Sequence, residues 1–288
     1  QEKFFVGPYA KYAEKYLGVK VRQKDETSDV FTYYDLNCKS ICAFSTKRGL
    51  QIKDSDPYSA FNINPFCGDD TEHINNCMDV FCNYLNISTN KVYLPHQIHG
   101  DEILKIDESF SEISSDEKAE RLNGVDAVIS NIKNICICVS TADCVPILIY
   151  DTENNVIAAI HAGWRGTVKR IVEKTISKMQ DEYNTNPKNC ISLIGPSISK
   201  DRFEVGDEVY EVFRNENFNM KEIASLYPVA NNPGKQKWHI DLWAANRLQL
   251  IGAGIKDSNI GIVGICTYDN VDTYFSARKL GICSGRII

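Results

Sequence analysis

Histidine is scarce in this chain of 288 residues, which has five: His73, His96, His99, His161 and His239. So few imidazoles limit how many metal centres the chain can build. There is also no run of about 18 apolar residues, so no membrane-spanning helix is predicted. Neither charge dominates, because 32 basic residues stand against 38 acidic ones. A nucleic acid is therefore not expected as the main partner.

The cysteines lack the spacings of a zinc knuckle or of a small disulfide scaffold. No pair fits the CxxC pattern, and eleven cysteines are spread over a long chain. We therefore expect reduced thiols and a cytoplasmic location. The first eight residues are too short and too polar for a signal peptide, although a leader could have been removed before this numbering begins.

The composition is that of a globular protein, with 43% hydrophobic and 24% charged residues. No change in composition marks an internal boundary, so we expect a single domain over residues 36–288. Residues 1–35 are set apart as an N-terminal extension of unknown role, with a short helix over Tyr9–Leu17. Strands mixed with helices predict an α+β sandwich.

Apolar periodicity predicts helices over residues 72–85, 167–183, 205–213 and 242–250. Thr71 and Asp241 are the expected N-caps of the first and last of these. Residues 110–121 are expected to form a surface loop or short helix. Strands are expected over 38–46, 91–94, 102–106, 127–130, 135–140, 146–150, 156–160, 191–194 and 260–266.

Residues 146–150 and 156–160 flank a polar turn and so predict a β-hairpin. With the turn centred near residue 153, paired residue numbers sum to about 306. Cys144 and His161 are thus expected within one residue of direct register. Facing Cβ atoms lie roughly 4.5–5.5 Å apart, so the two could share a metal ion, or the imidazole could deprotonate the thiol. The alternative is a buried cysteine beside a core histidine.

Further candidates surround this pair. Arg165 precedes the helix expected near Thr167, whose N-terminus could bind an anion; a tight connection with Arg165 in a salt bridge is the alternative. His96 and His99 would point to opposite faces of a strand, so one of them at most can join Cys144 and His161. Arg278 and Arg286 could hold a phosphate, or could be solvated surface residues.

Taken together, these segments resemble the YfiH family, also called laccase-domain or polyphenol-oxidase-like proteins. The resemblance covers roughly residues 40–288, and the combination of its third and fourth segments is highly specific. The matching segments are Phe44-Ser45-Thr46-Lys47-Arg48-Gly49, Gln97-Ile98-His99-Gly100, Thr141-Ala142-Asp143-Cys144-Val145-Pro146, His161-Ala162-Gly163-Trp164-Arg165-Gly166, Gly195-Pro196-Ser197-Ile198, Phe203-Glu204-Val205-Gly206, His239-Ile240-Asp241-Leu242, and Phe275-Ser276 through Arg286.

The resemblance implies a zinc site formed by His99, Cys144 and His161, which would also be the catalytic residues. It implies a sandwich of mixed sheets flanked by helices, of the α/β/β/α type. The implied activity is phosphorolysis of purine nucleosides (adenosine, inosine, guanosine and methylthioadenosine) with adenosine deamination beside it. Substrate and phosphate would be bound by Arg165, Arg278, Asp143 and Arg48. The chain departs from the family at Arg202-Phe203 and at Ala277 to Lys279, which puts substrate preference and phosphate contacts in question.

Three other functions stay open. The family name suggests a copper-dependent polyphenol oxidase, but five histidines cannot supply both a blue copper site and a trinuclear cluster. A metal-free Cys–His hydrolase could cleave an amide, as in the editing of peptidoglycan precursors. A binding module with structural zinc would need a fourth protein ligand. We expect small-molecule partners, no nucleic acid, no membrane, and a monomer or homodimer.

Overall fold

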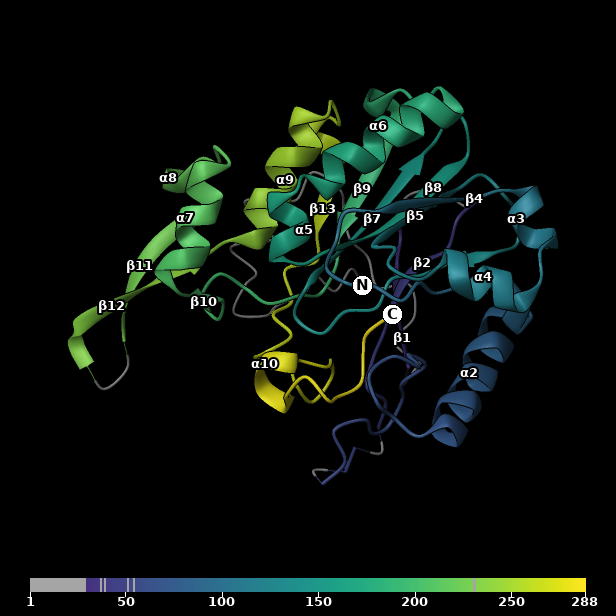
Figure 1. Ribbon diagram of the computed structural model, residues 1–288, viewed down its shortest axis with the longest axis horizontal. Helices are drawn as coiled ribbons and strands as arrows, with labels where there is room; N and C mark the ends of the chain where they lie inside the picture. Colours follow the sequence, from purple (N-terminus) through teal and green to yellow (C-terminus); the bar gives the residue numbers. More distant parts are fainter. Residues whose placement is uncertain (1–29, 37, 39, 51, 54, 230–231) are drawn as a thin grey trace, which may run out of the picture.

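A six-stranded mixed sheet forms the centre of the protein in this computed structural model (Figure 1). The structure describes residues 30–288 except 37, 39, 51, 54, 230 and 231. The outer pairs of the sheet are parallel and the inner pairs antiparallel. In spatial order the strands are β13 (Ile260–Ile262), β9 (Cys190–Ile194), β7 (Val145–Asp151), β8 (Val156–Ala162), β5 (Ala127–Ser130) and β4 (Ile103–Ile106).

Three helices cover one face of this sheet: α5 (Trp164–Val168), α6 (Ile171–Tyr183) and α9 (Leu242–Gly252) (Figure 1). Their apolar stripes pack against alternate residues of β7 and β8, such as Ile147 and Ile160, in the largest buried cluster of the described residues. Burial of this apolar surface is the main stabilising contribution to the fold.

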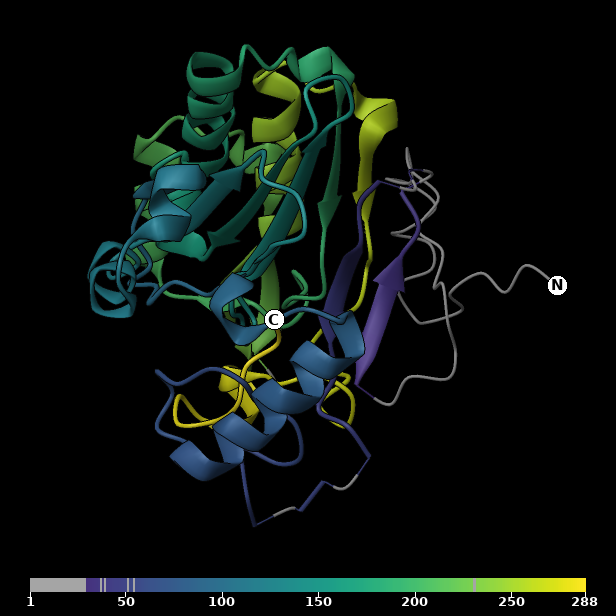
Figure 2. The same ribbon diagram turned by 90° about the vertical axis from the view of Figure 1, so that its right-hand side faces the viewer.

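The opposite face carries a second layer of short strands. β1 (Phe31–Tyr34) pairs antiparallel with β2 (Ala43–Thr46), and β3 (Val92–Tyr93) pairs parallel with β6 (Cys136–Ile137). Helix α2 (Thr71–Leu85) packs against this layer through its buried residues. Figure 2 shows the β1–β2 hairpin on the side of the sheet away from α6. The expected mixed-sheet sandwich flanked by helices is confirmed.

A three-stranded sheet projects from the body together with two helices, α7 (Asp207–Asn215) and α8 (Met220–Ile223) (Figure 1). Its strands, in spatial order, are β10 (Glu204–Val205), β12 (Asn232–Ile240) and β11 (Ala224–Val229). Within the described part of the chain, no helix combines the length and the apolarity needed to cross a bilayer. The remaining elements are η1 (Thr89–Lys91), α3 (Glu108–Glu112), α4 (Ser115–Arg121), η2 (Pro187–Asn189), η3 (Asp257–Asn259) and α10 (Ala277–Leu280).

The expected helix over 167–183 is wrong at its start. The chain becomes helical already at Trp164, with Gly163 as N-cap, and Arg170 adopts a left-handed conformation (φ 63°) that separates α5 from α6. The apolar spacing continues across this break, so the pattern hides it. Similarly, the N-cap of α2 is Asp70 rather than Thr71, because the Asp70 side chain accepts the backbone N–H groups of Glu72 and His73.

Other boundaries differ by a few residues. The strands expected over 38–46, 135–140 and 260–266 are shorter, and Val205 belongs to β10 rather than to the helix that follows. The hairpin β11–β12 was not predicted, since its strands are half-exposed and polar. β1 lies inside the segment 1–35 that was set apart, and the expected helix Tyr9–Leu17 lies outside the described residues.

Asp241 caps α9 as predicted and links its stability to pH. Its carboxylate accepts the Ala244 N–H at 2.9 Å, and burial raises the pKa of this carboxyl to about 6. Because the folded-state pKa lies above the unfolded one, this group stabilises the fold most below pH ~4, and that contribution is lost as pH rises through ~6.

We predict that Asp241→Asn, which keeps a good N-cap, removes this pH dependence. Relative to the unsubstituted protein, the variant should gain on the order of 2 kcal/mol in free energy of unfolding between pH 4 and pH 7. Urea unfolding at the two pH values measures the change. An unchanged difference between the two proteins would show that Asp241 titrates normally.

Candidate metal centre

The β7–β8 hairpin brings Cys144 and His161 to the same end of the sheet. Val145 pairs with Ala162 and Pro146 with His161, so paired residue numbers sum to 307 rather than 306. The register prediction was off by one, because the connecting turn is four residues long and centred half a residue later. Cys144 is therefore offset by two residues from direct register, which leaves it diagonal to His161.

His99 completes a cluster with these two residues. It lies in the loop before β4, and one ligand atom from each of His99, Cys144 and His161 lies within 4.8 Å of the others. His161 is buried, Cys144 half-buried and His99 exposed, so the cluster opens to solvent on the His99 side. His96 does not join it: its Nδ1 meets Asn123 Oδ1 at 2.7 Å and its ring stacks on Phe66.

A buried carboxylate, Asp126, holds two of the three residues in place. Its oxygens accept the backbone N–H groups of Ile98 (3.2 Å), His99 (3.0 Å) and Gly100 (2.7 Å), and the ring Nδ1 of His161 at 2.7 Å. These contacts secure His99 in its left-handed conformation (φ 61°). Because Nδ1 donates to the carboxylate, Nε2 of His161 is the nitrogen available to a metal.

Asp126 is not among the site residues predicted from the sequence. The signal was present but slight: a single acidic residue directly before the fully buried strand β5. Burial by itself would raise the pKa of Asp126, but the hydrogen bond and charge of His161 outweigh it and lower that pKa. Asp126 therefore stays a carboxylate, which suits the positioning of a histidine ligand.

Glycine at position 163 is required by close approach to two members of the cluster. A Cβ there would lie 3.0 Å from Cys144 Sγ and 3.1 Å from His99 Cδ2. Gln97 fixes the same loop from the other side, because its side-chain amide donates to Ser140 O (2.9 Å) and accepts Ser140 N–H (2.7 Å). The loop that carries His99 is thereby fastened to the segment that leads to Cys144.

The thiol of Cys144 and the imidazole of His161 polarise each other. Burial opposes ionisation of both groups, but their mutual attraction is larger. The charge of His161, with hydrogen bonds from His161 and His99, lowers the pKa of Cys144 to about 6. The charge of Cys144 and the hydrogen bond to Asp126 raise the pKa of His161 to about 9. Both shifts favour a thiolate beside an imidazolium when no metal is bound.

This cluster has the composition of a catalytic zinc site. One thiolate and two imidazoles form a set of three protein ligands, which leaves a fourth position for water or substrate. No other group of three such side chains converges in the part of the chain that the structure describes. The other histidines are engaged elsewhere: His73 with Asp69 and His239 with Lys200 O. The residues present therefore fit a single metal ion.

The four expected substrate residues divide into two groups. Arg165 and Arg278 are exposed; the Arg165 guanidinium lies 4.3 Å from the Trp164 ring centre, and that of Arg278 lies 5.6 Å from the Phe203 ring centre. Asp143 and Arg48 are buried and make internal contacts. Asp143 accepts Thr267 Oγ1–H and Arg278 N–H, both at 2.7 Å, and Arg48 donates to the carbonyls of Ser59 and Val271.

Comparison with known proteins places the chain in a family. The model of a family described as multi-copper polyphenol oxidoreductase laccase matches residues 41–288. The chain belongs to this laccase-domain family. It is 42% identical over 231 residues to a purine nucleoside phosphorylase of Bacteroides thetaiotaomicron, covering 80% of this chain and 84% of that protein.

Two further proteins are similar to this laccase-domain chain. It is 40% identical over 244 residues to adenosine deaminase RL5 of an unidentified prokaryote, covering 85% of this chain and 90% of the relative. The crystal structure of the Bacillus licheniformis hypothetical protein YfiH superimposes with a TM-score of 0.80 at 22% identity, over 91% of this chain and 96% of the other. The latter shows the shared fold.

We predict that Asp126→Asn weakens zinc binding by about 10- to 100-fold, because an amide NH2 cannot replace an oxygen that accepts these N–H groups. Competition with a chromophoric zinc chelator measures the affinity. Asp101→Asn is the matched control, since Asp101 pairs with Lys169 and Lys174 on the surface. Equal zinc affinity in both variants would contradict the positioning role of Asp126.

We also predict that Gly163→Ala lowers zinc affinity at least about tenfold while the laccase domain remains folded, because the added methyl group displaces Cys144 and His99. Circular dichroism measures folding, and competition with the same chelator measures zinc affinity. Gly252→Ala is the control, since a Cβ at position 252 meets no atom within 4 Å. Unchanged zinc affinity in Gly163→Ala would refute the close packing.

Proposed function

We propose that this protein is a zinc-dependent purine nucleoside phosphorylase acting on adenosine, inosine, guanosine and methylthioadenosine, with adenosine deaminase side activity. The observation that carries the proposal is the convergence of His99, Cys144 and His161 within 4.8 Å. The names of two relatives support both activities. In this proposal residues 36–288 form the catalytic domain, in the cytoplasm; none of the eleven cysteines forms a disulfide in the structure.

Deamination needs a water activated next to the adenine ring. When bound, zinc supplies a Lewis acid that lowers the pKa of a coordinated water to about 7. The chain contributes the three ligands, and Asp126 keeps His161 oriented through Nδ1. The exposed side of the cluster, at His99, is where a nucleoside could enter. Water replaces the amino group and ammonia leaves, so adenosine becomes inosine.

Phosphorolysis needs a phosphate held against C1′ of the ribose while the bond to the base breaks. Arg165 and Arg278 are the cations we assign to this phosphate, because both guanidinium groups are exposed. Arg165 lies two residues after Gly163, which contacts Cys144 and His99. The backbone N–H of Arg278 donates to Asp143, the residue before Cys144. Both arginines therefore lie in segments that contact the cluster of His99, Cys144 and His161 or its sequence neighbours. A guanidinium matches phosphate geometry through paired N–H donors.

Two other functions have an observation in their favour. The family description favours a copper oxidase, and two histidines with one cysteine can also bind copper. The thiolate–imidazolium pair of Cys144 and His161 favours a metal-free hydrolase. A blue absorption band after copper loading would indicate the first. Activity on an amide that survives chelation would indicate the second.

The direct test incubates the purified, zinc-loaded protein with adenosine, with and without phosphate, and separates the products. We expect adenine and ribose 1-phosphate only when phosphate is present, and inosine in either case. Inosine alone would restrict the function to deamination. Absence of adenine, inosine, hypoxanthine and ribose 1-phosphate would overturn the proposal.

We predict that Cys144→Ala and His161→Ala lose zinc and lower activity by at least about 100-fold, the upper range of losses caused by residues behind the ligands. His96→Ala is the matched control, because His96 lies on the same loop as His99 but outside the cluster. Metal analysis, turnover and circular dichroism are measured together. Full zinc content in the folded Cys144 variant would refute the site.

A further inference from the structure

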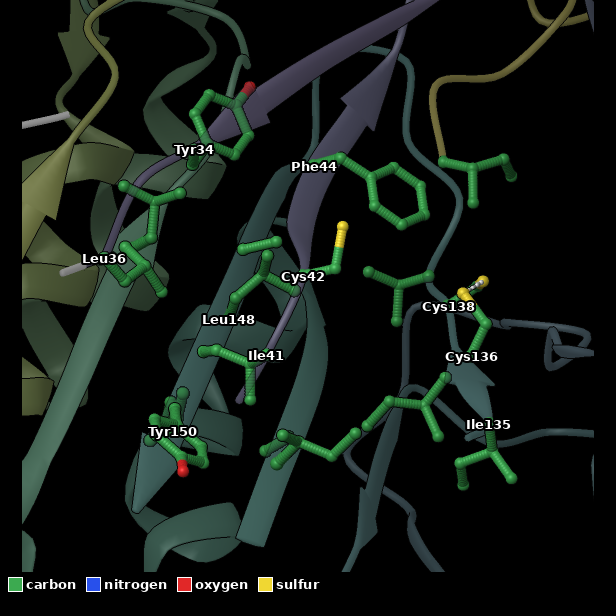
Figure 3. Close-up of a pocket in the computed structure, with 18 of the residues that line it drawn as sticks. Tyr34, Leu36, Ile41, Cys42, Phe44, Ile135, Cys136, Cys138, Leu148 and Tyr150 are labelled. Atoms are coloured by element: carbon green, nitrogen blue, oxygen red, sulfur yellow. Dashed lines mark hydrogen bonds between the residues drawn. The ribbon is translucent and has the colours of Figure 1, made fainter. Parts of the chain in front are cut away.

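An apolar cavity lies between the two layers of the sandwich. The cavity, of about 550 Å³, separates the β1–β2 hairpin and β6 from β7 and β8 of the large sheet. In Figure 3, Leu148 and Tyr150 of β7 lie on one side of it and Ile135, Cys136 and Cys138 on the other. None of His99, Cys144 and His161 lines it. Its volume is that of an ordinary small-molecule site.

The walls of this cavity are apolar and incompletely covered. Ile41, Ile135, Leu148 and Ile157 all line it, and each is only half-buried although it faces the space between the two layers. Removing such surface from water is favourable by about 25 cal/mol per Å². An apolar ligand therefore gains more here than at an ordinary surface.

The cavity is elongated along strand β7. Its lining includes Pro146 and Tyr150, four residues apart on β7, so it extends about 13 Å along the strand, which suits an aliphatic chain of about ten carbons. At the Pro146 end lies the buried hydroxyl of Thr141, for which no hydrogen-bond partner occurs among the described residues. That hydroxyl could bond a polar atom or a water at the inner end of a ligand.

The other end is polar and carries one positive charge. Ile157 of β8 pairs with both Tyr150 and Ser130, which places the segment that follows Ser130 at the Tyr150 end. That segment contributes the exposed Asn131, Lys133 and Asn134 to the lining. No aspartate or glutamate occurs among the described lining residues, and Lys133 is the charged one. This edge therefore favours an anionic group over a cationic one.

We propose that the cavity binds an aliphatic carboxylate of medium chain length. The chain lies along β7 among Leu148, Ile157 and Ile41, and the carboxylate lies at Lys133. This ligand site is separate from the metal cluster and independent of the proposed nucleoside chemistry. The cavity and His161 lie on the same face of the large sheet, since Pro146 lines the cavity and pairs directly with His161.

Isothermal titration calorimetry of the zinc-loaded full chain with decanoate tests the proposal. We expect saturable binding at submillimolar concentrations of decanoate. Ile157→Trp places a bulky ring in the path of the aliphatic chain and should weaken binding at least about tenfold, while phosphorolysis stays unchanged. Ile251→Trp makes the same change on exposed α9 and should bind decanoate normally.

Lys133→Gln tests the contribution of the ligand's carboxylate separately from that of its aliphatic chain. Because Lys133 is exposed, this variant should fold even if Ile157→Trp does not. It should weaken decanoate about fivefold, as an exposed ion pair allows, and leave uncharged decan-1-ol unaffected. Equal loss of both ligands, or no loss of either, would overturn the role of Lys133. Failure of the full chain to bind decanoate at millimolar concentration would overturn the site, as would undiminished binding to folded Ile157→Trp.

Discussion

The hydrogen bonds of the buried Asp126 carboxylate are the interaction on which the cluster of His99, Cys144 and His161 depends. This carboxylate collects three backbone N–H groups from the loop that carries His99 and the ring N–H of His161 from β8. An unpaired carboxylate in that place would cost several kcal/mol, so the loop and the strand are held together whenever the domain is folded. The folded chain itself thus sets the relative positions of His99 and His161.

Other parts of the fold position Cys144 beside His99 and His161. Antiparallel pairing of β7 and β8 places the cysteine diagonal to His161, and the side chain of Gln97 fastens the His99 loop to Ser140. Gly163 then leaves room for the thiol and the imidazole to approach. Because the large sheet and its helices are closely packed, these three features belong to a rigid part of the structure. The internal hydrogen bonds of Asp143 and Arg48 add to this rigidity.

Much of this arrangement could be predicted from the sequence. The apolar runs fixed the hairpin, and the positions of Cys144 and His161 at their ends indicated a shared site. Register was wrong by one because turn length is not readable from composition. The break at Arg170 was hidden by an apolar period that runs through it, and β11–β12 lacks the apolar alternation of a buried strand. Asp126 was missed because a single acidic residue forms no recognisable sequence pattern. Its role depends on four N–H donors that come together only in the folded chain.

X-ray absorption at the zinc edge of the purified enzyme tests the central claim most directly, because it reports the atoms bound to the metal itself. We expect one sulfur at about 2.3 Å and two imidazole nitrogens at about 2.0–2.1 Å, with a lighter atom completing the shell. A shell without sulfur, or with two or more sulfurs, would contradict a single metal ion held by His99, Cys144 and His161.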